Sequence, residues 1–283
     1  MNKLMEENKK NLSFLGPVGT YSEAAALEYK KDVHNLIPKS NLSEVLGSVV
    51  ANTSEEAILP IENSRVGTII EVIDYLINSK NLFINHELLL PIEACLITKE
   101  NIKNLNHIRE IISKPEAINQ CNEWISKNLR KDIVVTGSPS TAEAVESLNN
   151  LPDSVAAIGP ERAAVIHKKH IVKKGIQDYK NNVTRFVVIS NEENKPTGKD
   201  KTSIAFDFKK TDKAGLLFTA LQCFSKRNIN LQKIESRPKG TKLGEYIFII
   251  DLDGHLQDEN IEEALKELKQ VTSFLKVLGS YSY

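Results

Sequence analysis

Residues 11–190 alternate short apolar runs with amphipathic stretches, and this alternation constrains the fold more than any other feature of the sequence. Runs such as AILPIE (57–62) and SVAAIG (154–159) have the length and composition of buried strands. The stretches between such runs place apolar residues at helical spacing. Strands that alternate with helices predict an α/β domain with mostly parallel sheets.

One segment of this region interrupts the alternation. Residues 82–98 are too long for a single strand and contain Pro91 in their middle, so we expect them to cross from one lobe to another. A second crossing near 171–178 would return the chain, which leaves a cleft between two lobes. The predicted lobes of this 1–190 domain comprise about residues 1–88 with 176–190, and about residues 89–175.

A different pattern follows residue 190. Residues 191–201 are polar and charged and contain Pro and Gly, which is typical of a linker. Residues 202–283 then predict the order strand, helix, strand, strand, helix, strand. This βαββαβ order is that of a ferredoxin-like α+β module. A chain of 283 residues is long enough for both units.

Composition excludes several classes of protein. Lys plus Arg and Asp plus Glu both number 37, so the chain lacks the positive charge that nucleic-acid binding requires. No apolar run is long enough for a membrane span, and no signal peptide is evident, so we expect a cytoplasmic protein. The three Cys residues are far apart and the six His residues are scattered, so we expect buried reduced thiols and no metal site.

Polar residues at predicted strand ends are the candidate ligand-binding groups. Thr20 with Glu23, and Ser140 with Glu143, satisfy a capping box, which is a sufficient structural explanation for both. In open α/β sheets, however, such turns also bind ligands, and free N–H groups at helix starts attract carboxylates. No phosphate-binding or dinucleotide-binding fingerprint occurs in the sequence. The further candidates at strand ends are Glu62, Asn63, Ser64 and Thr141.

The stretch NVTRF (182–186) places a hydroxyl, a guanidinium and an aromatic ring at the start of the apolar run FVVI. A solvated arginine at a strand end is one interpretation. The other is a binding group, because a guanidinium can bind a carboxylate through two parallel hydrogen bonds.

Seven motifs in order resemble those of a known enzyme family. They are GPVGTYS (16–22), PIENSRVG (60–67), SKPEAINQC (113–121), STAEA (140–144), NVTRF (182–186), GLLFTAL (215–221) and ESRP (235–238). Together they cover nearly the whole chain and are similar to those of prephenate dehydratase with a C-terminal ACT domain. Lys114 and Glu116 stand where the family usually has His and Gln, and Ala214 and Leu216 replace its usual Pro and Ala.

The resemblance implies a two-lobed catalytic domain like a periplasmic binding protein, and an ACT regulatory domain. The implied reaction converts prephenate to phenylpyruvate with loss of carbon dioxide and water, and it needs no cofactor. Thr184 is then the expected catalytic residue, a hydrogen-bond donor to the departing oxygen. Arg185 would anchor a carboxylate and Phe186 would form an apolar wall. The full set of expected substrate-binding residues is Thr20, Glu62, Asn63, Ser64, Ser140, Thr141, Asn182, Arg185 and Phe186.

The resemblance also implies feedback inhibition by L-phenylalanine. The turn before the first ACT helix would hold the amino acid's carboxylate, and ESRP would face that turn across a subunit interface in a homodimer or a dimer of dimers. The expected effector-binding residues are Asp212, Ala214, Gly215, Leu216, Glu235, Ser236, Arg237 and Pro238.

Two alternative functions stay open at this point. Arogenate dehydratase differs only in a substrate amine that replaces a keto oxygen, and no residue of the sequence discriminates between the two. A non-catalytic amino-acid sensor would combine a binding-protein cleft with an ACT domain. The few residues before the first predicted strand lead us to expect no fused chorismate mutase, and the missing dinucleotide fingerprint argues against prephenate dehydrogenase.

Overall fold

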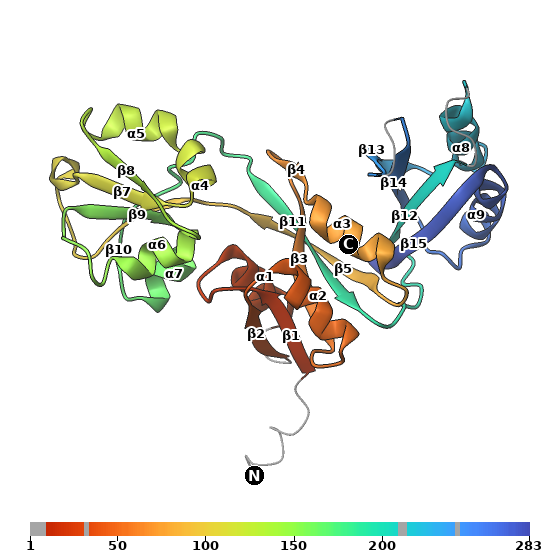
Figure 1. Cartoon of the computed structure of the whole chain (residues 1–283), viewed down its shortest axis with the longest axis horizontal. Coiled ribbons are helices and arrows are strands. Elements are labelled where there is room, and N and C mark those ends of the chain that lie inside the picture. The colour runs from red at the N-terminus through yellow and green to blue at the C-terminus, as the bar shows by residue number, and fades with distance from the viewer. Residues whose placement is uncertain (1–9, 31–33, 209–213, 241–243) are drawn as a thin grey trace, which may run out of the picture.

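In the described part of the chain, two β-sheets organise the fold, and one of them runs through two structural units (Figure 1). The computed structural model describes residues 10–30, 34–208, 214–240 and 244–283. Its ten-stranded sheet has the order β13-β14-β12-β15-β5-β11-β3-β1-β2, with β4 paired to β3. A five-stranded sheet has the order β10-β6-β9-β7-β8.

The first lobe lies at the centre of Figure 1. It contains β1 (Lys10–Leu15), α1 (Tyr21–Lys30), β2 (His34–Lys39), α2 (Leu42–Val50), β3 (Glu56–Asn63), β4 (Gly67–Thr68), α3 (Ile70–Asn78), β5 (Phe83–Pro91) and β11 (Val183–Ser190). Capping explains some of the boundaries. The Asn41 side chain accepts a hydrogen bond from the Glu44 N–H at 2.8 Å, which starts α2.

The second lobe is built on the five-stranded sheet. It contains β6 (Cys95–Thr98), the 3₁₀ turn η1 (Leu105–His107), β7 (Glu110–Ser113), α4 (Pro115–Asn119), α5 (Asn122–Asn128), β8 (Val134–Gly137), α6 (Thr141–Ser147), β9 (Val155–Gly159), α7 (Glu161–Ile166) and β10 (His170–Lys174). Residues 82–98 form β5 of one sheet and β6 of the other, so they connect the lobes.

The C-terminal module follows the predicted βαββαβ order. It contains β12 (Asp200–Phe208), α8 (Leu216–Ser225), β13 (Leu231–Pro238), β14 (Tyr246–Asp253), α9 (Glu259–Val271) and β15 (Thr272–Ser282). Apolar residues of α8 and α9, including Phe224 and Leu268, pack on one face of its sheet against Phe206 and Ile250. The edge strand of this module is β13.

The expectation of mostly parallel strands is only partly right. β1 pairs in parallel with β2 and β3, and β7 pairs in parallel with β8 and β9. The strand β11, however, is antiparallel to both of its neighbours, β3 and β5. The reason is that β5 leads the chain out of the first lobe, whereas β11 brings it back from the second lobe and therefore runs in the opposite direction.

The opposite face of the C-terminal sheet packs against the first lobe. Ile249 and Leu278 of the module share one apolar core with Ile73 of α3 and Ile84 of β5. A parallel contact between Ser282 and His86 joins β15 to β5, which makes the ten-stranded sheet continuous. The two units therefore share both a sheet and a core.

Candidate active site

The ends of β3 and β11 bring four predicted site residues together. In the antiparallel pairing Thr184 lies opposite Asn63, and Arg185 lies opposite Glu62. Successive side chains on a strand point to opposite faces of the sheet. Thr184 and Asn63 therefore share one face, and Arg185 and Glu62 share the other. A β-bulge follows at once, between Arg185 and Phe186, a feature that is over-represented beside active sites.

Asn63 orients the hydroxyl group of Thr184. The Asn63 Nδ2 group donates to Thr184 Oγ1 at 2.9 Å and to Asn182 Oδ1 at 2.8 Å. Its Oδ1 accepts hydrogen bonds from the backbone N–H groups of Arg65 and Val66, which fixes which end of the amide faces Thr184. The bond from Asn63 uses a lone pair of the Thr184 oxygen, and a hydroxyl group can donate its own hydrogen at the same time. No acceptor for that hydrogen lies among residues 10–30, 34–208, 214–240 and 244–283.

Two further contacts hold this strand end in place. Ser64 Oγ accepts a hydrogen bond from the Val183 N–H at 3.0 Å, and it donates to the Asn181 carbonyl at 3.2 Å. The Asn182 side chain is 3% exposed and donates to Gln120 Oε1 of the second lobe at 3.1 Å. Thr184 itself is 8% exposed. The strand end is thus a nearly buried polar cluster that both lobes contact.

A cavity of about 930 Å³ lies between the lobes. Thr20 lines it from the first lobe, and Ser140 and Thr141 line it from the second. Its basic residues are Lys39, Lys114 and His167. The lining does not include the cluster around Thr184. Tyr21 lines the cavity and also packs on the apolar cluster that contains Phe186, two residues after Thr184 on β11.

The hydroxyl groups of Thr20 and Ser140 also cap helices. Each accepts a hydrogen bond from the backbone N–H three residues later, Glu23 N at 3.3 Å and Glu143 N at 3.1 Å. Thr20 Oγ1 lies 2.9 Å from the Pro17 carbonyl, to which it donates. The capping interpretation of both motifs is therefore confirmed.

The two lobes touch at the start of α1. The carboxylate of Glu23, which is buried, accepts two hydrogen bonds from the guanidinium of Arg162 on α7, at 3.1 and 3.2 Å. Gly19 has φ of +92°, and a Cβ there would lie 3.2 Å from the backbone of Ala163 in the second lobe. Glycine permits this close approach of the lobes.

In this structure the Arg185 side chain points away from Thr184 and toward the C-terminal module, a different placement from the substrate anchor that the sequence analysis expected. Its side chain is 11% exposed and contacts Asp251 Oδ2 at 2.6 Å, the Tyr281 hydroxyl at 2.7 Å and Glu87 Oε2 at 2.6 Å. Burial acts to lower the pKa of Arg185, but neighbouring Tyr281, Asp251 and Glu87 raise it more, so the net pKa is above its usual value. The guanidinium is committed to protein carboxylates.

Glu62 and Phe186 also differ from expectation. Glu62 lies 3.3 Å from Arg185 and 3.1 Å from Lys233 of the C-terminal module, so it faces that module. Phe186 is 2% exposed and packs with Leu12, Phe14 and Val188 in the core of the first lobe. Phe186 lies on the face of the sheet that α1 covers, where Ala25 and Ala26 belong to the same apolar cluster, so it forms part of the core.

The expected effector residues fall in three places. Gly215 has φ of +86° and, with Ala214 and Leu216, forms the start of α8. On β13, Glu235 bonds Thr68 and Arg237 pairs with Asp74, so both face the first lobe in the same chain. Ser236 and Pro238 alternate with them and are exposed. Asp212 lies outside the described residues.

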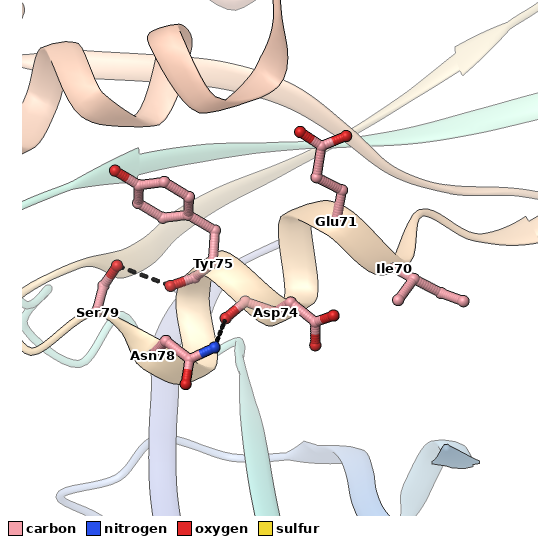
Figure 2. A pocket seen from close by; sticks show the side chains of 6 residues that line it. All are labelled: Ile70, Glu71, Asp74, Tyr75, Asn78 and Ser79. Atoms are coloured by element: carbon pink, nitrogen blue, oxygen red, sulfur yellow. Dashed lines mark hydrogen bonds between the residues drawn. The ribbon is translucent and has the colours of Figure 1, made fainter. Parts of the chain in front are cut away.

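A shallow groove of about 600 Å³ runs along the outer face of α3 (Figure 2). Ile70, Glu71, Asp74, Tyr75, Asn78 and Ser79 line it. Figure 2 shows that hydrogen bonds from Asn78 and Ser79 end on backbone carbonyls of α3, so these side chains support the helix itself. The groove lacks the convergent polar groups of the interlobe cavity.

The three cysteines are buried thiols, as the sequence analysis expected. All three thiols are free and buried, and burial raises the pKa of both Cys95 and Cys121 to about 12. Within the part of the chain that the structure describes, no cluster of His, Cys, Asp and Glu has the arrangement of a metal site. The helices of the described residues include none with the length and apolarity needed to cross a membrane.

Sequence reasoning missed three residues that shape the site. Gln120 contacts Asn182, and Arg162 joins the lobes. Lys39 adds a positive charge to the cavity. Gln120 is the second-last residue of the SKPEAINQC motif, and that motif was the available signal for it. Arg162 and Lys39 stand just after β9 and at the end of β2, where strand-end residues meet.

Comparison with known proteins identifies the family. The prephenate dehydratase family model matches residues 12–194, and the ACT domain model matches residues 210–270. A bifunctional chorismate mutase/prephenate dehydratase from Aquifex aeolicus is 39% identical over 97% of this chain and 74% of its own length. Arogenate dehydratase 1 of Petunia hybrida is 36% identical over 98% of this chain and 68% of its own.

A solved structure supports the same assignment. The prephenate dehydratase of Arthrobacter aurescens in complex with L-Phe superposes with a TM-score of 0.85 at 31% identity, over 96% of this chain and 90% of that one. The match covers both lobes and the C-terminal module. The chain therefore belongs to the prephenate dehydratase family of lyases and carries a C-terminal ACT domain.

Proposed function

We propose that this enzyme converts prephenate to phenylpyruvate in phenylalanine biosynthesis in the cytoplasm. The observation that carries the proposal is the hydrogen bond from Asn63 Nδ2 to Thr184 Oγ1 at 2.9 Å. It leaves the Thr184 hydrogen free to bond an oxygen that gains negative charge. An aliphatic hydroxyl is a weak acid, so Thr184 acts as a positioned donor to the departing hydroxyl group.

The substrate's two carboxylates need anchors other than Arg185. Lys39 and Lys114 enter the cavity from opposite lobes. The Lys114 side chain is 50% exposed and lies 3.7 Å from Glu116, a loose pair that a substrate carboxylate can replace. Thr20, Ser140 and Thr141 add hydroxyl groups in the same cavity. Lys114 thus supplies a positive charge where the family usually has His.

The reaction also needs the lobes to move. The cavity and the Thr184 cluster are separate in this structure, since the cavity lining includes none of Asn63, Asn182 and Thr184. Movement about the two crossings, between β5 and β6 and between β10 and β11, would open the Glu23–Arg162 contact and join them. Binding-protein folds commonly close around a ligand by such a hinge movement between their lobes.

We propose further that L-phenylalanine inhibits the enzyme through the ACT domain of a homodimer or a dimer of dimers. The Arthrobacter structure contains L-Phe, and the ACT match includes the α8 turn and β13. The edge strand β13 and nearby helix α8 expose Ile234 and Phe218, 48% and 68% exposed, which a second copy would cover.

One assay tests the reaction and its alternative. Purified protein is incubated with prephenate, and phenylpyruvate is measured by its absorbance in alkali. The protein is also incubated with arogenate, and the phenylalanine formed is measured to give the rate with that substrate. This comparison is necessary because the chain is similar to the arogenate dehydratase of Petunia hybrida. A higher kcat/KM for arogenate would reassign the substrate, and the absence of both products would reject dehydratase activity.

A further inference from the structure

We infer that Arg185 and Glu62 are positioning residues through which the ACT domain acts on Thr184. The inference rests on the proposed function for the role of Thr184 and for regulation by phenylalanine. It concerns the side of the sheet opposite the candidate active site. There, the two residues next to the catalytic pair are tied to the regulatory domain.

The geometry of the strand pair is the main observation. The dipeptide Glu62-Asn63 of β3 pairs with Thr184-Arg185 of β11. Asn63 and Thr184 bond each other on one face, at 2.9 Å. Glu62 and Arg185 contact each other on the opposite face, at 3.3 Å. A shift of either charged residue therefore moves its neighbour in the catalytic pair.

Arg185 is bound to the ACT domain through buried groups. Asp251 of β14 is 3% exposed, and its Oδ2 lies 2.6 Å from Arg185 Nη1. Tyr281 of β15 is fully buried and lies 2.7 Å from Arg185 Nη2. Ser203 of β12 bonds both partners, at 2.5 Å to Asp251 and 2.6 Å to Tyr281. Three strands of the ACT sheet thus hold one guanidinium.

Glu62 is bound to the strand that carries ESRP. Lys233 Nζ of β13 lies 3.1 Å from Glu62 and 3.3 Å from Glu235, and it bonds Thr68 Oγ1 at 2.7 Å. Lys233 lies two residues before the first residue of ESRP, Glu235. A ligand that displaces β13 would move Lys233, and through it Glu62 and the loop that starts at Asn63.

These contacts form a charged network that tolerates little displacement. Its members are Glu62, Glu87, Arg185, Lys201, Lys233 and Asp251, with Glu235 at the edge. Charge interactions are strong where water is excluded, and a buried charge that loses its partner is costly. The network therefore has a strong preference for one arrangement of the ACT sheet relative to β3 and β11.

Lys233 is the best residue for a test, because it contacts no proposed substrate group. Lys233→Gln removes its charge, Lys233→Arg retains it, and Lys266→Gln is a matched control on the surface of α9, where Lys266 pairs only with Glu262 at 2.7 Å among the described residues. For each protein, the rate is measured without phenylalanine and at saturating phenylalanine, and phenylalanine binding is measured by calorimetry.

We expect Lys233→Gln to bind phenylalanine but to reduce the ratio of uninhibited to inhibited rate by about fivefold or more, the size of a typical allosteric coupling. Lys233→Arg and Lys266→Gln should keep the wild-type ratio. Hydrogen exchange of peptides that cover residues 56–63 and 183–190 should respond to phenylalanine in the wild type and much less in Lys233→Gln. A merely structural role for Lys233 would not change this response.

The outcomes separate the two proposals. If the wild type is inhibited and Lys233→Gln binds phenylalanine and is inhibited to the same degree, the coupling inference alone is wrong. If the wild type binds phenylalanine without inhibition, the proposed regulation is wrong and the inference falls with it. If Lys233→Gln does not fold, Glu62→Gln replaces it; this variant weakens the contacts of Glu62 with both Lys233 and Arg185, so it tests both arms of the network together, and unchanged inhibition would again contradict the inference.

Discussion

Gly279 of β15 lies against the backbone of Ile84 of β5. A Cβ at Gly279 would overlap the carbonyl oxygen, nitrogen and carbonyl carbon of Ile84. The φ angle of Gly279 is +151°, a value that favours glycine. The contact lies where β15 runs beside β5. The shared core and the charged network around Arg185 both depend on this close approach of the two domains.

Gly279→Ala should therefore destabilise the protein strongly. We expect a loss of about 3 kcal/mol in the free energy of unfolding, at the upper end of ordinary point substitutions, because the added methyl group forces β15 away from β5. Gly240→Ala is the matched control, since Gly240 also has positive φ, +80°, but open space around it. It should cost only about 1 kcal/mol. Urea denaturation measures both, and equal losses would contradict the close approach.

Thr184→Ala should fold normally and lose about 10²–10³-fold in kcat, the effect of removing one positioned donor from a site where charge develops. Thr53→Ala serves as a control, because the Thr53 hydroxyl bonds only the Ser48 carbonyl among the described residues. Steady-state kinetics with prephenate measure the change. Retention of more than about half of the wild-type kcat would remove Thr184 from the mechanism.

Arg185→Met should act on stability rather than on substrate affinity. Removing one partner of a buried ion pair costs about 3–5 kcal/mol, and here it leaves Asp251 and Glu87 without their shared guanidinium. KM for prephenate should stay within about twofold of the wild type, because Arg185 contacts protein carboxylates and the substitution removes no contact with the substrate. A KM that rises steeply in a variant of unchanged stability would restore Arg185 as a substrate anchor.

Removal of the ACT domain after Lys199 should destabilise the catalytic domain. The truncation would expose Ile73 and Ile84, which pack against Ile249 and Leu278 in the shared core. We expect a lower midpoint of thermal unfolding and aggregation on heating, because a large apolar surface enters water. Calorimetry of the truncated and full-length proteins tests this. An unchanged midpoint would show that the two domains are independent in stability.

Asp200 should make stability depend on pH. Burial acts to raise the pKa of Asp200, but hydrogen bonds from Thr197 and Gly198, with help from His255, lower it further, so the net pKa is below its usual value. A lowered pKa adds stability above the unfolded value of about 3.9, and this stability is lost as pH falls through the folded value.

Asp200→Asn tests this dependence. It should lower the free energy of unfolding at pH 7 by about 1–3 kcal/mol, and the difference from the wild type should shrink at pH values below the usual Asp pKa. The exposed Asp153, which is 3.8 Å from Lys99, provides the control Asp153→Asn. Urea denaturation at several pH values measures both. A difference that does not change with pH would assign the effect to packing.

The sequence by itself determined the elements and the motifs of this protein. Apolar periodicity located β3, β9 and α9, and Pro91 marked the end of β5 before the crossing to β6, because these signals depend on neighbouring residues. The capping motifs at Thr20 and Ser140 were also readable for that reason. The order of seven motifs was sufficient to identify the family that the comparisons then showed.

Only the tertiary structure decided where the side chains at the strand ends point. Thr184, Arg185 and Phe186 are consecutive, yet they lie in the candidate site, in the contact with the C-terminal module and in the core, respectively. The pleat sends Arg185 to the face opposite Thr184 and Phe186, and what covers each part of a face depends on distant segments of the chain. Asp251 and Tyr281 lie 66 and 96 residues from Arg185, so their contacts with it arise only when β14 and β15 pack against the first lobe.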